Sequence, residues 1–467
     1  MRPTAELIDL PTENFRSRIE RLSETPRVTA DGLPFMHKFT IAIATFVLSA
    51  SAAAQVSPSA ADPERMEQRI RALSEFGRNG DGGVDRVAYS DADVAGREFV
   101  SGLMREVGLT VRTDTAGNII GRRAGTNPRL PPIMFGSHID SVPGGGNYDG
   151  DVGVIGAIEV AQLIVERGIR LAHPIEVVVF ADEEGALAGS RAMIGKLTNS
   201  ALDVQSHSGL SVREGIRRIG GDPEQLELAV RRPDDIAAFI ELHIEQGAVL
   251  DEADVDIGVV EGIVGIRWWD VTIEGFANHA GTTPMNQRRD ALVTAAELTL
   301  AVSRIAREMP GRQVATVGRI HAFPGAPNVI PGNVVMSLEI RDLDAAKMQQ
   351  VFDRITAEAA RLSDARSTPI AFREIELLLQ PAPTDVRMRR IISRAAAALG
   401  LSFMAMPSGA GHDAQDMATI APTGMIFVPS VGGISHSPQE FTSATDMANG
   451  ANVLLDTVLA IDGGALQ

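Results

Sequence analysis

Two short segments of this chain are apolar at almost every position. Residues 132–135 and 175–180 have this composition, and between them Val154, Ile158 and Ala161 recur at helical spacing. Strands that are apolar on both faces and separated by helices are typical of a parallel sheet covered by helices on both sides. The sequence therefore predicts an α/β domain built on a mostly parallel sheet.

The pattern changes near residue 258. Apolar residues now alternate with polar ones in two segments, at Trp269, Val271 and Ile273, and again at Val334, Met336, Leu338 and Ile340. Alternation predicts an antiparallel sheet with one covered face. A chain of 467 residues is also too long for one core. We therefore expect an inserted α+β lid domain at 258–376, between the two parts of the first domain, 62–257 and 377–467.

Residues 36–54 have the three parts of a signal peptide. A basic start at Met36–Lys38 precedes an apolar run at 39–48 and a stretch of small residues. The apolar run is too short for a comfortable membrane span, so a single-pass anchor or a buried helix is the weaker alternative. We expect residues 1–35 to be an upstream mis-start. The mature protein would be periplasmic or secreted, without a stable membrane anchor.

Composition excludes several kinds of site. The chain has no cysteine, which excludes disulfides, thiolate metal ligands and thiol nucleophiles. Its net charge of −17 argues against nucleic acid as a partner, because such binding needs clustered Lys and Arg. Any metal ion must be held by His, Asp or Glu.

Acidic residues and a histidine follow the two apolar strands directly. His138 and Asp140 follow the first strand, Glu183 and Glu184 follow the second, and Asp149 lies in the loop between them. The carboxyl ends of parallel strands meet at one edge of a sheet, where functional residues gather. Adjacent carboxylates without a nearby Lys or Arg are costly unless a cation is present. A divalent metal site is therefore favoured over the alternative, a solvated acidic loop.

Two further histidines lie in compact polar motifs. His243 belongs to the run 241–247, and His436 belongs to the run 432–438. Each histidine alone is more often structural, but together with the first group they complete a pair of sites with nitrogen and oxygen ligands. Three imidazoles with carboxylates suit Zn, Mn, Co or Ni, and the sequence does not choose among them.

From about residue 64 to 460 the chain resembles the amidase, hydantoinase and carbamoylase branch of the M20 metallopeptidase superfamily. This branch includes N-carbamoyl-L-amino-acid hydrolases and allantoate amidohydrolases. The runs that carry the resemblance are Gly136–Ser141, Tyr148–Gly150, Glu183–Gly185, Glu241–Gly247, Asn278–Met285, Pro327–Gly332, Ser408–Asp413 and Ile434–Pro438. In one place the chain departs from the family pattern, because the run 183–191 is a few residues shorter, which changes the border of the substrate pocket.

The resemblance implies two divalent metal ions per subunit. Asp149 would bridge them, with His138 and His243 completing one site and Glu184 and His436 completing the other. Two such ions lower the pKa of water and polarise a scissile carbonyl.

The resemblance also assigns roles around the metal ions. Glu183 would be the general base, which takes a proton from the attacking water and returns it to the leaving nitrogen. Asp140 would accept a hydrogen bond from the second ring nitrogen of His138 and so orient it. Gln246 and His412 would lie near the substrate.

The inserted domain would contribute further groups and would form a homodimer. By the same resemblance, His279 stabilises the oxyanion, reaching in from the partner subunit, and Asn328 and Arg341 bind the substrate carboxylate. The alternation around Arg341 supports its place opposite the apolar face of its strand. The alternative for Arg341 is an exposed arginine in a salt bridge.

The sequence therefore predicts a metal-dependent hydrolase of a linear C–N bond. The substrate would be a small ureido or amide compound with a carboxylate, such as an N-carbamoyl-amino acid, allantoate or ureidoglycolate. One alternative is an aminoacylase or dipeptidase of the same superfamily. Another is a non-catalytic periplasmic binder of amino-acid-like ligands, which the presence of the base Glu183 argues against.

Overall fold

The structure is a computed structural model that describes residues 60–466, apart from the side chains of residues 376–379. The predicted mis-start at 1–35 and signal peptide at 36–54 lie outside the described residues, so export stays a prediction. None of the helices in the described part of the chain combines the length and the apolar character needed to cross a membrane.

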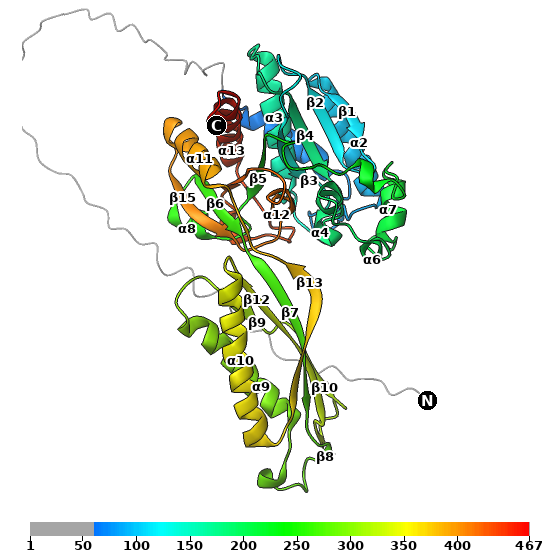
Figure 1. The fold of residues 1–467 in the computed structure, drawn as a ribbon. Coiled ribbons are helices and arrows are strands. Elements are labelled where there is room, and N and C mark those ends of the chain that lie inside the picture. Colours follow the sequence, from blue (N-terminus) through cyan, green and yellow to red (C-terminus); the bar gives the residue numbers. More distant parts are fainter. Residues whose placement is uncertain (1–59, 467) are drawn as a thin grey trace, which may run out of the picture. The chain divides into compact units, whose positions relative to one another are not determined.

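A nine-stranded sheet forms the centre of the first domain (Figure 1). Its order is β1-β2-β4-β3-β5-β16-β6-β14, with β15 also paired to β6. The strands are β1 (Thr110–Thr113), β2 (Ile119–Arg123), β3 (Ile133–His138), β4 (Ile175–Phe180), β5 (Ala238–Ile244), β6 (Ile257–Ile263), β14 (Ala382–Pro383), β15 (Phe403–Ser408) and β16 (Thr423–Val428). The central pairs β4–β3, β3–β5 and β5–β16 are parallel, which confirms the predicted mostly parallel sheet.

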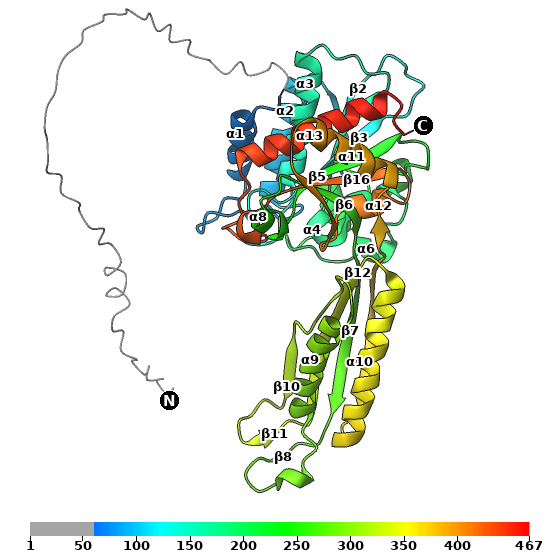
Figure 2. The same ribbon diagram turned by 90° about the vertical axis from the view of Figure 1, so that its left-hand side faces the viewer.

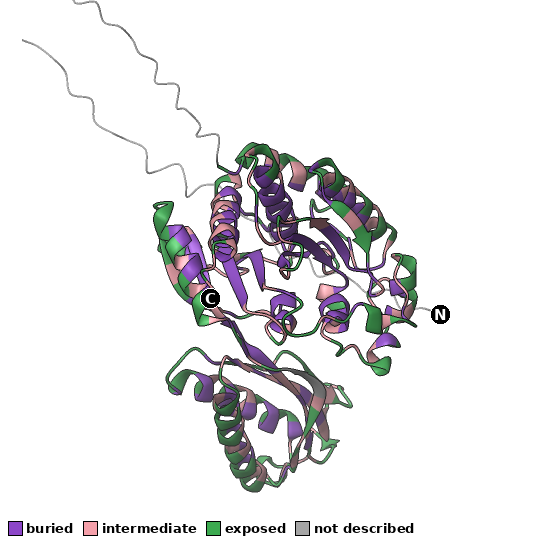
Figure 3. Cartoon of the chain, turned by 45° about the horizontal axis from the view of Figure 1, so that its top comes forward, coloured by how far each residue is buried: buried purple, intermediate pink, exposed green. Residues whose placement is uncertain are grey.

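Helices cover both faces of this sheet, as predicted. One face packs against α1 (Pro63–Ser74), α2 (Asp91–Glu106), α3 (Asp151–Glu166), α11 (Val386–Ala398) and α13 (Ala444–Asp462). The other face packs against α5 (Ala188–Met193), α8 (Val249–Ala253) and α12 (Asp413–Met417). The short helices α4 (Glu183–Ala186), α6 (Asn199–Leu202), α7 (Val212–Arg218), η1 (Leu226–Leu228) and η3 (Val431–Gly433) lie in the connections. Strands β3, β4, β5 and β16 are buried along their whole length (Figure 3).

A five-stranded antiparallel sheet forms the second domain (Figure 2). Its strands are β7 (Gly265–Glu274), β9 (Val314–Thr316), β10 (Ile320–Phe323), β12 (Asn333–Asp342) and β13 (Ile370–Leu379). Helices α9 (Ala291–Glu308) and α10 (Ala345–Arg366) cover one face, and strands β8 (Asn278–His279) and β11 (Val329–Ile330) form a separate pair, with η2 (Met285–Gln287) beyond β8. Burial along β12 alternates strictly, as predicted from its sequence.

The small sheet starts later than the expected boundary at residue 258. Strand β6 (Ile257–Ile263) still belongs to the large sheet, where it pairs with β15 and β16. The small sheet begins at Gly265 with β7 and ends at Leu379 with β13. The sequence placed the boundary too early because the composition of β6 is mixed, Gly258 and Glu261 included.

Candidate metal centre

Neighbouring strands of the large sheet bring the predicted ligands together. His138 is the last residue of β3, and His243 lies near the carboxyl end of the adjacent parallel strand β5. Glu183 and Glu184 begin α4 just after β4, and His436 lies in the loop after β16. The carboxyl ends of the four central strands therefore supply this site, as expected for an α/β sheet.

Asp149 faces both halves of the site, with one oxygen toward each. Its Oδ1 lies 3.1 Å from Nε2 of His243 and 3.7 Å from Nε2 of His138. Its Oδ2 lies 3.3 Å from Nε2 of His436. The loop that carries Asp149 can lie this close to His138 because the next residue is glycine. Gly150 has φ of +67°, and a Cβ there would lie 2.5 Å from the ring of His138.

Two groups of ligand atoms share Asp149. The first contains His138 and His243, the second contains Glu184 and His436, and in each group the atoms lie within 4.8 Å of one another. A carboxylate between two such groups, with imidazoles in both, has the donor chemistry that a pair of divalent transition metal ions requires.

A third group contains Glu241, His243 and His412. The oxygens of Glu241 already accept hydrogen bonds from Ser137 Oγ at 2.7 Å and from Ala414 N at 3.0 Å. Nε2 of His412 lies 2.8 Å from Ser408 Oγ. The ring of His412 also packs edge-on against the ring of His243, with the centroids 4.5 Å apart.

Backbone carbonyls select the tautomers of the two buried histidines. Nδ1 of His138 lies 2.9 Å from the carbonyl of Asp140, and Nδ1 of His243 lies 2.9 Å from the carbonyl of Ile244. A carbonyl only accepts hydrogen bonds, so each Nδ1 carries the proton. In the neutral rings each Nε2 then has its lone pair on the side of Asp149, where a metal ligand needs it.

The contact predicted for the carboxylate of Asp140 is wrong. Its Oδ1 lies 3.9 Å from Nδ1 of His138, whose proton goes to the backbone carbonyl instead. The carboxylate accepts hydrogen bonds from the backbone N–H groups of Glu183 at 3.2 Å and Glu184 at 3.1 Å. Asp182, with φ of +59°, turns the chain sharply after β4 and points these two N–H groups at Asp140. Asp140 therefore orients the acidic pair.

The electrostatics of the site call for a cation. Burial raises the pKa of Glu183 well above its usual range, and the charge of Glu184 raises it further. Burial lowers the pKa of His138 to about 4, so this imidazole is neutral at pH 7. A neutral imidazole beside several crowded carboxylates fits a divalent cation, which would remove the repulsion among the carboxylates.

Eight of the predicted residues line one cavity of about 390 Å³. Those that line it are His138, Asp149, Glu183, Glu184, Gln246, Arg341, His412 and His436. Gln246 donates from Nε2 to Oδ2 of Asp149 at 2.6 Å. Arg341 donates to Glu339 at 2.8 Å and to the carbonyl of Gly409 at 2.7 Å, which brings the inserted domain to the rim of the cavity.

His279 and Asn328 do not reach this cavity. They lie beside each other, where Val329 pairs with His279 and the carbonyl of Asn328 accepts from Ala280 N at 3.0 Å. The register of β12 on β7 puts Arg341 opposite Ile266, whereas His279 follows the other end of β7. That strand spans roughly 30 Å. Figure 1 shows β8 at the far end of the small sheet. Within one chain, His279 and Asn328 are therefore remote from Arg341.

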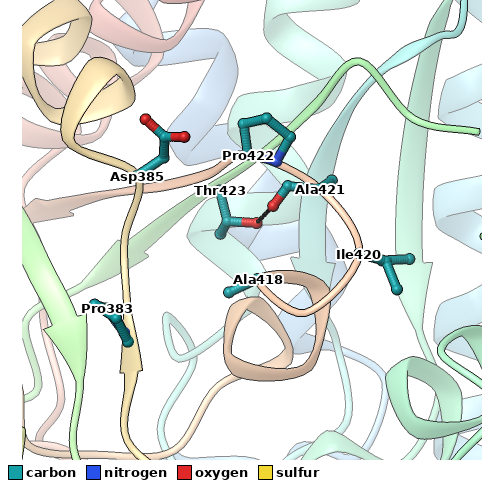
Figure 4. A pocket seen from close by; sticks show the side chains of 7 residues that line it. All are labelled: Pro383, Asp385, Ala418, Ile420, Ala421, Pro422 and Thr423. Atoms are coloured by element: carbon teal, nitrogen blue, oxygen red, sulfur yellow. Dashed lines mark hydrogen bonds between the residues drawn. The ribbon is translucent and has the colours of Figure 1, made fainter. Parts of the chain in front are cut away.

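A second hollow, of about 350 Å³, lies between the start of α11 and the loop before β16 (Figure 4). Its polar groups are already used. Asp385 caps α11 by accepting from Arg387 N at 2.7 Å, and Thr423 Oγ1 donates to the carbonyl of Ala421 at 3.1 Å. This hollow has no side chain available for chemistry.

Residues 134–460 match Peptidase family M20/M25/M40. The chain belongs to this family. It is 42% identical to the N-carbamoyl-L-amino acid amidohydrolase of Geobacillus stearothermophilus over 86% of this chain and 99% of that protein. It is 35% identical to the allantoate amidohydrolase of Bacillus subtilis over 83% of this chain and 95% of that protein.

A solved structure of a similar protein has the same fold. The hydantoinase/carbamoylase family amidase of Burkholderia multivorans superposes with a TM-score of 0.80 at 36% identity, covering 86% of this chain and 98% of that one. These comparisons confirm the predicted family, the predicted fold class and the predicted class of enzyme, a metal-dependent amidohydrolase.

The sequence analysis missed two residues that lie at this site. Glu440 is buried beside Asp149 and His436. Its position four residues after His436, in a polar motif, could have indicated from the sequence that it lies near the site. Arg191 lines the cavity from α5. It lies in the shortened run after Glu184, where no sequence pattern shows which way a side chain points.

We expect metal binding at pH 7 to release protons. A hydrogen bond to Asp149 raises the pKa of His436 to about 9, and burial with the charge of Asp149 raises the pKa of Glu184 to about 8. The contact with Asp149 outweighs burial and raises the pKa of His243 to about 9 as well. All three groups are protonated at pH 7 before the metal binds, and each must lose its proton to become a ligand. Affinity should therefore rise from about pH 6 to about pH 9. Titration calorimetry in two buffers of different ionisation enthalpy measures the release, and a heat independent of the buffer would contradict it.

Proposed function

We propose that this chain hydrolyses a linear ureido or amide C–N bond in a small substrate that carries a carboxylate. N-carbamoyl-L-amino acids are the first candidates, and allantoate and ureidoglycolate are the related ones. The observation that supports this most is the position of Asp149, with one oxygen toward each of two ligand groups and the buried Glu183 beside them. Relatives named for these activities align with most of this chain.

Two divalent ions held by the five ligand residues would lower the pKa of the attacking water and polarise the scissile carbonyl. We propose that the ions are Zn, Mn, Co or Ni. His138 and His243 are preorganised for this, because their Nδ1 protons are fixed by backbone carbonyls. Asp140 holds the turn that carries Glu183 and Glu184.

Glu183 is the proposed general base. Its side chain is 8% exposed, lines the cavity, and has Oε2 3.7 Å from Nε2 of His138. It takes a proton from the attacking water and transfers it to the leaving nitrogen. With an N-carbamoyl-amino acid and one water molecule, the products are ammonia, carbon dioxide and the free amino acid.

The inserted domain is proposed to form a homodimer. Large apolar side chains are exposed on it, among them Phe276, Met285, Leu292, Val293, Leu300 and Phe323. Exposed apolar groups of this kind mark protein interfaces. A partner would also explain His279, which is remote from the cavity of its own chain.

The imidazole of His279 is set up as a hydrogen-bond donor. Its Nδ1 accepts from Gly281 N at 3.0 Å and from Thr282 N at 3.3 Å, so the ring proton of the neutral form is on Nε2. Nε2–H of His279 of the partner subunit would then stabilise the oxyanion that forms at the scissile carbonyl. Asn328, beside it, would enter the same site.

The substrate carboxylate is proposed to bind the arginines of the cavity. Arg341 is already hydrogen-bonded to Glu339 and Gly409, whereas Arg191 has an ion pair with Asp416 at 3.8 Å. A planar guanidinium suits a carboxylate, to which it donates two parallel hydrogen bonds. Arg191 therefore joins Arg341 and Asn328 as a candidate for this contact.

A substrate panel tests the function. Purified protein loaded with Mn²⁺ or Zn²⁺ is incubated with N-carbamoyl-L-amino acids, allantoate, ureidoglycolate, N-acetyl amino acids and dipeptides, and released ammonia and free amine are followed. We expect turnover of the ureido compounds that disappears after chelation and returns after reloading. Turnover of dipeptides or N-acyl amino acids alone would favour the aminoacylase or dipeptidase alternative. Binding without turnover of any compound would favour the non-catalytic binder.

A further inference from the structure

The side chain of Glu440 is 3% exposed and accepts four hydrogen bonds. Its Oε1 accepts from the backbone N–H groups of Tyr148 at 2.8 Å and Asp149 at 2.9 Å. Its Oε2 accepts from Ser435 Oγ at 3.0 Å and from His436 N at 3.2 Å. Each of the two carboxylate oxygens therefore accepts two hydrogen bonds.

These hydrogen bonds join two loops that are remote in the sequence. One loop precedes α3 and carries Asp149, and the other follows β16 and carries His436. Ser435 Oγ also lies 3.0 Å from Oδ2 of Asp149, which adds a direct contact between the loops. Gly146 leaves the space for this arrangement, because a Cβ on it would overlap the carboxylate of Glu440.

The two ligand groups depend on this contact to different degrees. In the first group His138 and His243 lie on fully buried strands, which hold them without Glu440. In the second group the side chain of His436 is 48% exposed, and its backbone has φ of +54° in a loop. Glu184 lies on a single helical turn. The geometry of the second group thus rests on the loops that Glu440 holds together.

We propose that Glu440 is a positioning residue that sets the affinity of the second metal site, the one formed by Asp149, Glu184 and His436. It belongs to neither of the two ligand groups and does not line the cavity. It acts through the backbone of Asp149 and His436, as groups behind metal ligands commonly do. This inference rests on the proposed dinuclear function.

The variant Glu440→Gln tests it with Mn²⁺ as the probe. The amide keeps the size of the side chain, but its NH₂ group faces two of the four donors and removes their hydrogen bonds. We expect the first Mn²⁺ to bind as in wild type and the second to bind about 10- to 100-fold more weakly. Electron paramagnetic resonance should then show isolated Mn²⁺ where wild type shows a spin-coupled pair. Raising the Mn²⁺ concentration should restore turnover, which a merely structural defect would not permit.

Glu245→Gln is the matched control. Glu245 is also a buried carboxylate, and it accepts from Val249 N at 2.8 Å and Leu250 N at 2.7 Å, within one segment. It joins no ligand loops, so we expect both ions to bind with wild-type affinity. Ser435→Ala is a milder second variant. It removes one hydroxyl and should lower the affinity for the second Mn²⁺ by about three- to tenfold.

Several outcomes would overturn the inference. Wild-type affinity for both ions in Glu440→Gln would do so, and so would equal weakening of both sites. If circular dichroism shows that Glu440→Gln does not fold, Ser435→Ala provides the test. Wild-type affinity of Ser435→Ala for the second Mn²⁺ would then also overturn the inference. A wild-type protein that binds fewer than two ions would instead refute the dinuclear function itself.

Discussion

Replacing Glu183 by Gln should lower kcat by about 10²- to 10⁴-fold while two metal ions remain bound. The amide has the same size as the carboxylate, but it cannot take a proton from the attacking water. Asp140 holds this residue through the backbone N–H of Glu183, so the substitution leaves that hydrogen bond in place. Steady-state kinetics and metal analysis of the same preparation measure both quantities.

The adjacent residue provides a matched control for this prediction. Glu184→Gln is the same chemical change one position further along α4, but Oε1 of Glu184 lies 3.4 Å from Nε2 of His436, in the second ligand group. We expect this variant to lose affinity for one ion and to recover turnover at high metal concentration. Full turnover in Glu183→Gln, or loss of metal from it, would refute the role of Glu183.

Replacing His279 by Ala should lower kcat by about 10²- to 10³-fold, the cost of one oxyanion donor. In the single chain this residue is exposed and lies at the end of β7 opposite to Arg341, so no effect is expected unless a second subunit brings it to the cavity. Metal content should be unchanged, because His279 belongs to neither ligand group.

Mixing the two inactive variants tests the dimer directly. In a heterodimer of Glu183→Gln and His279→Ala, one active site has both Glu183 and a partner His279 intact. After random exchange of subunits, about a quarter of the wild-type activity should return, as expected for a two-fold symmetric dimer. No recovery, with exchange verified by native mass spectrometry, would show that His279 acts within its own chain.

Much of the fold could be predicted because each part has a local signature. Continuous apolar runs such as 175–180 indicate strands buried on both faces, and strict alternation at Val334 and Met336 indicates a sheet with one covered face. Strand β6 was harder to assign, because its place in the large sheet depends on its partners β15 and β16.

The sequence alone determined which residue types stand at the carboxyl ends of the strands, and so the presence of His138, Glu183 and His243 at one edge of the sheet. The apolar runs predict the buried strands, and a parallel arrangement brings their carboxyl ends to one edge, so this edge was accessible to inference. Only the tertiary structure decided that Asp140 orients the acidic pair and that Glu440 joins two ligand loops. These contacts pair groups far apart in the chain. A hydrogen bond between such groups depends on distances that no local pattern encodes.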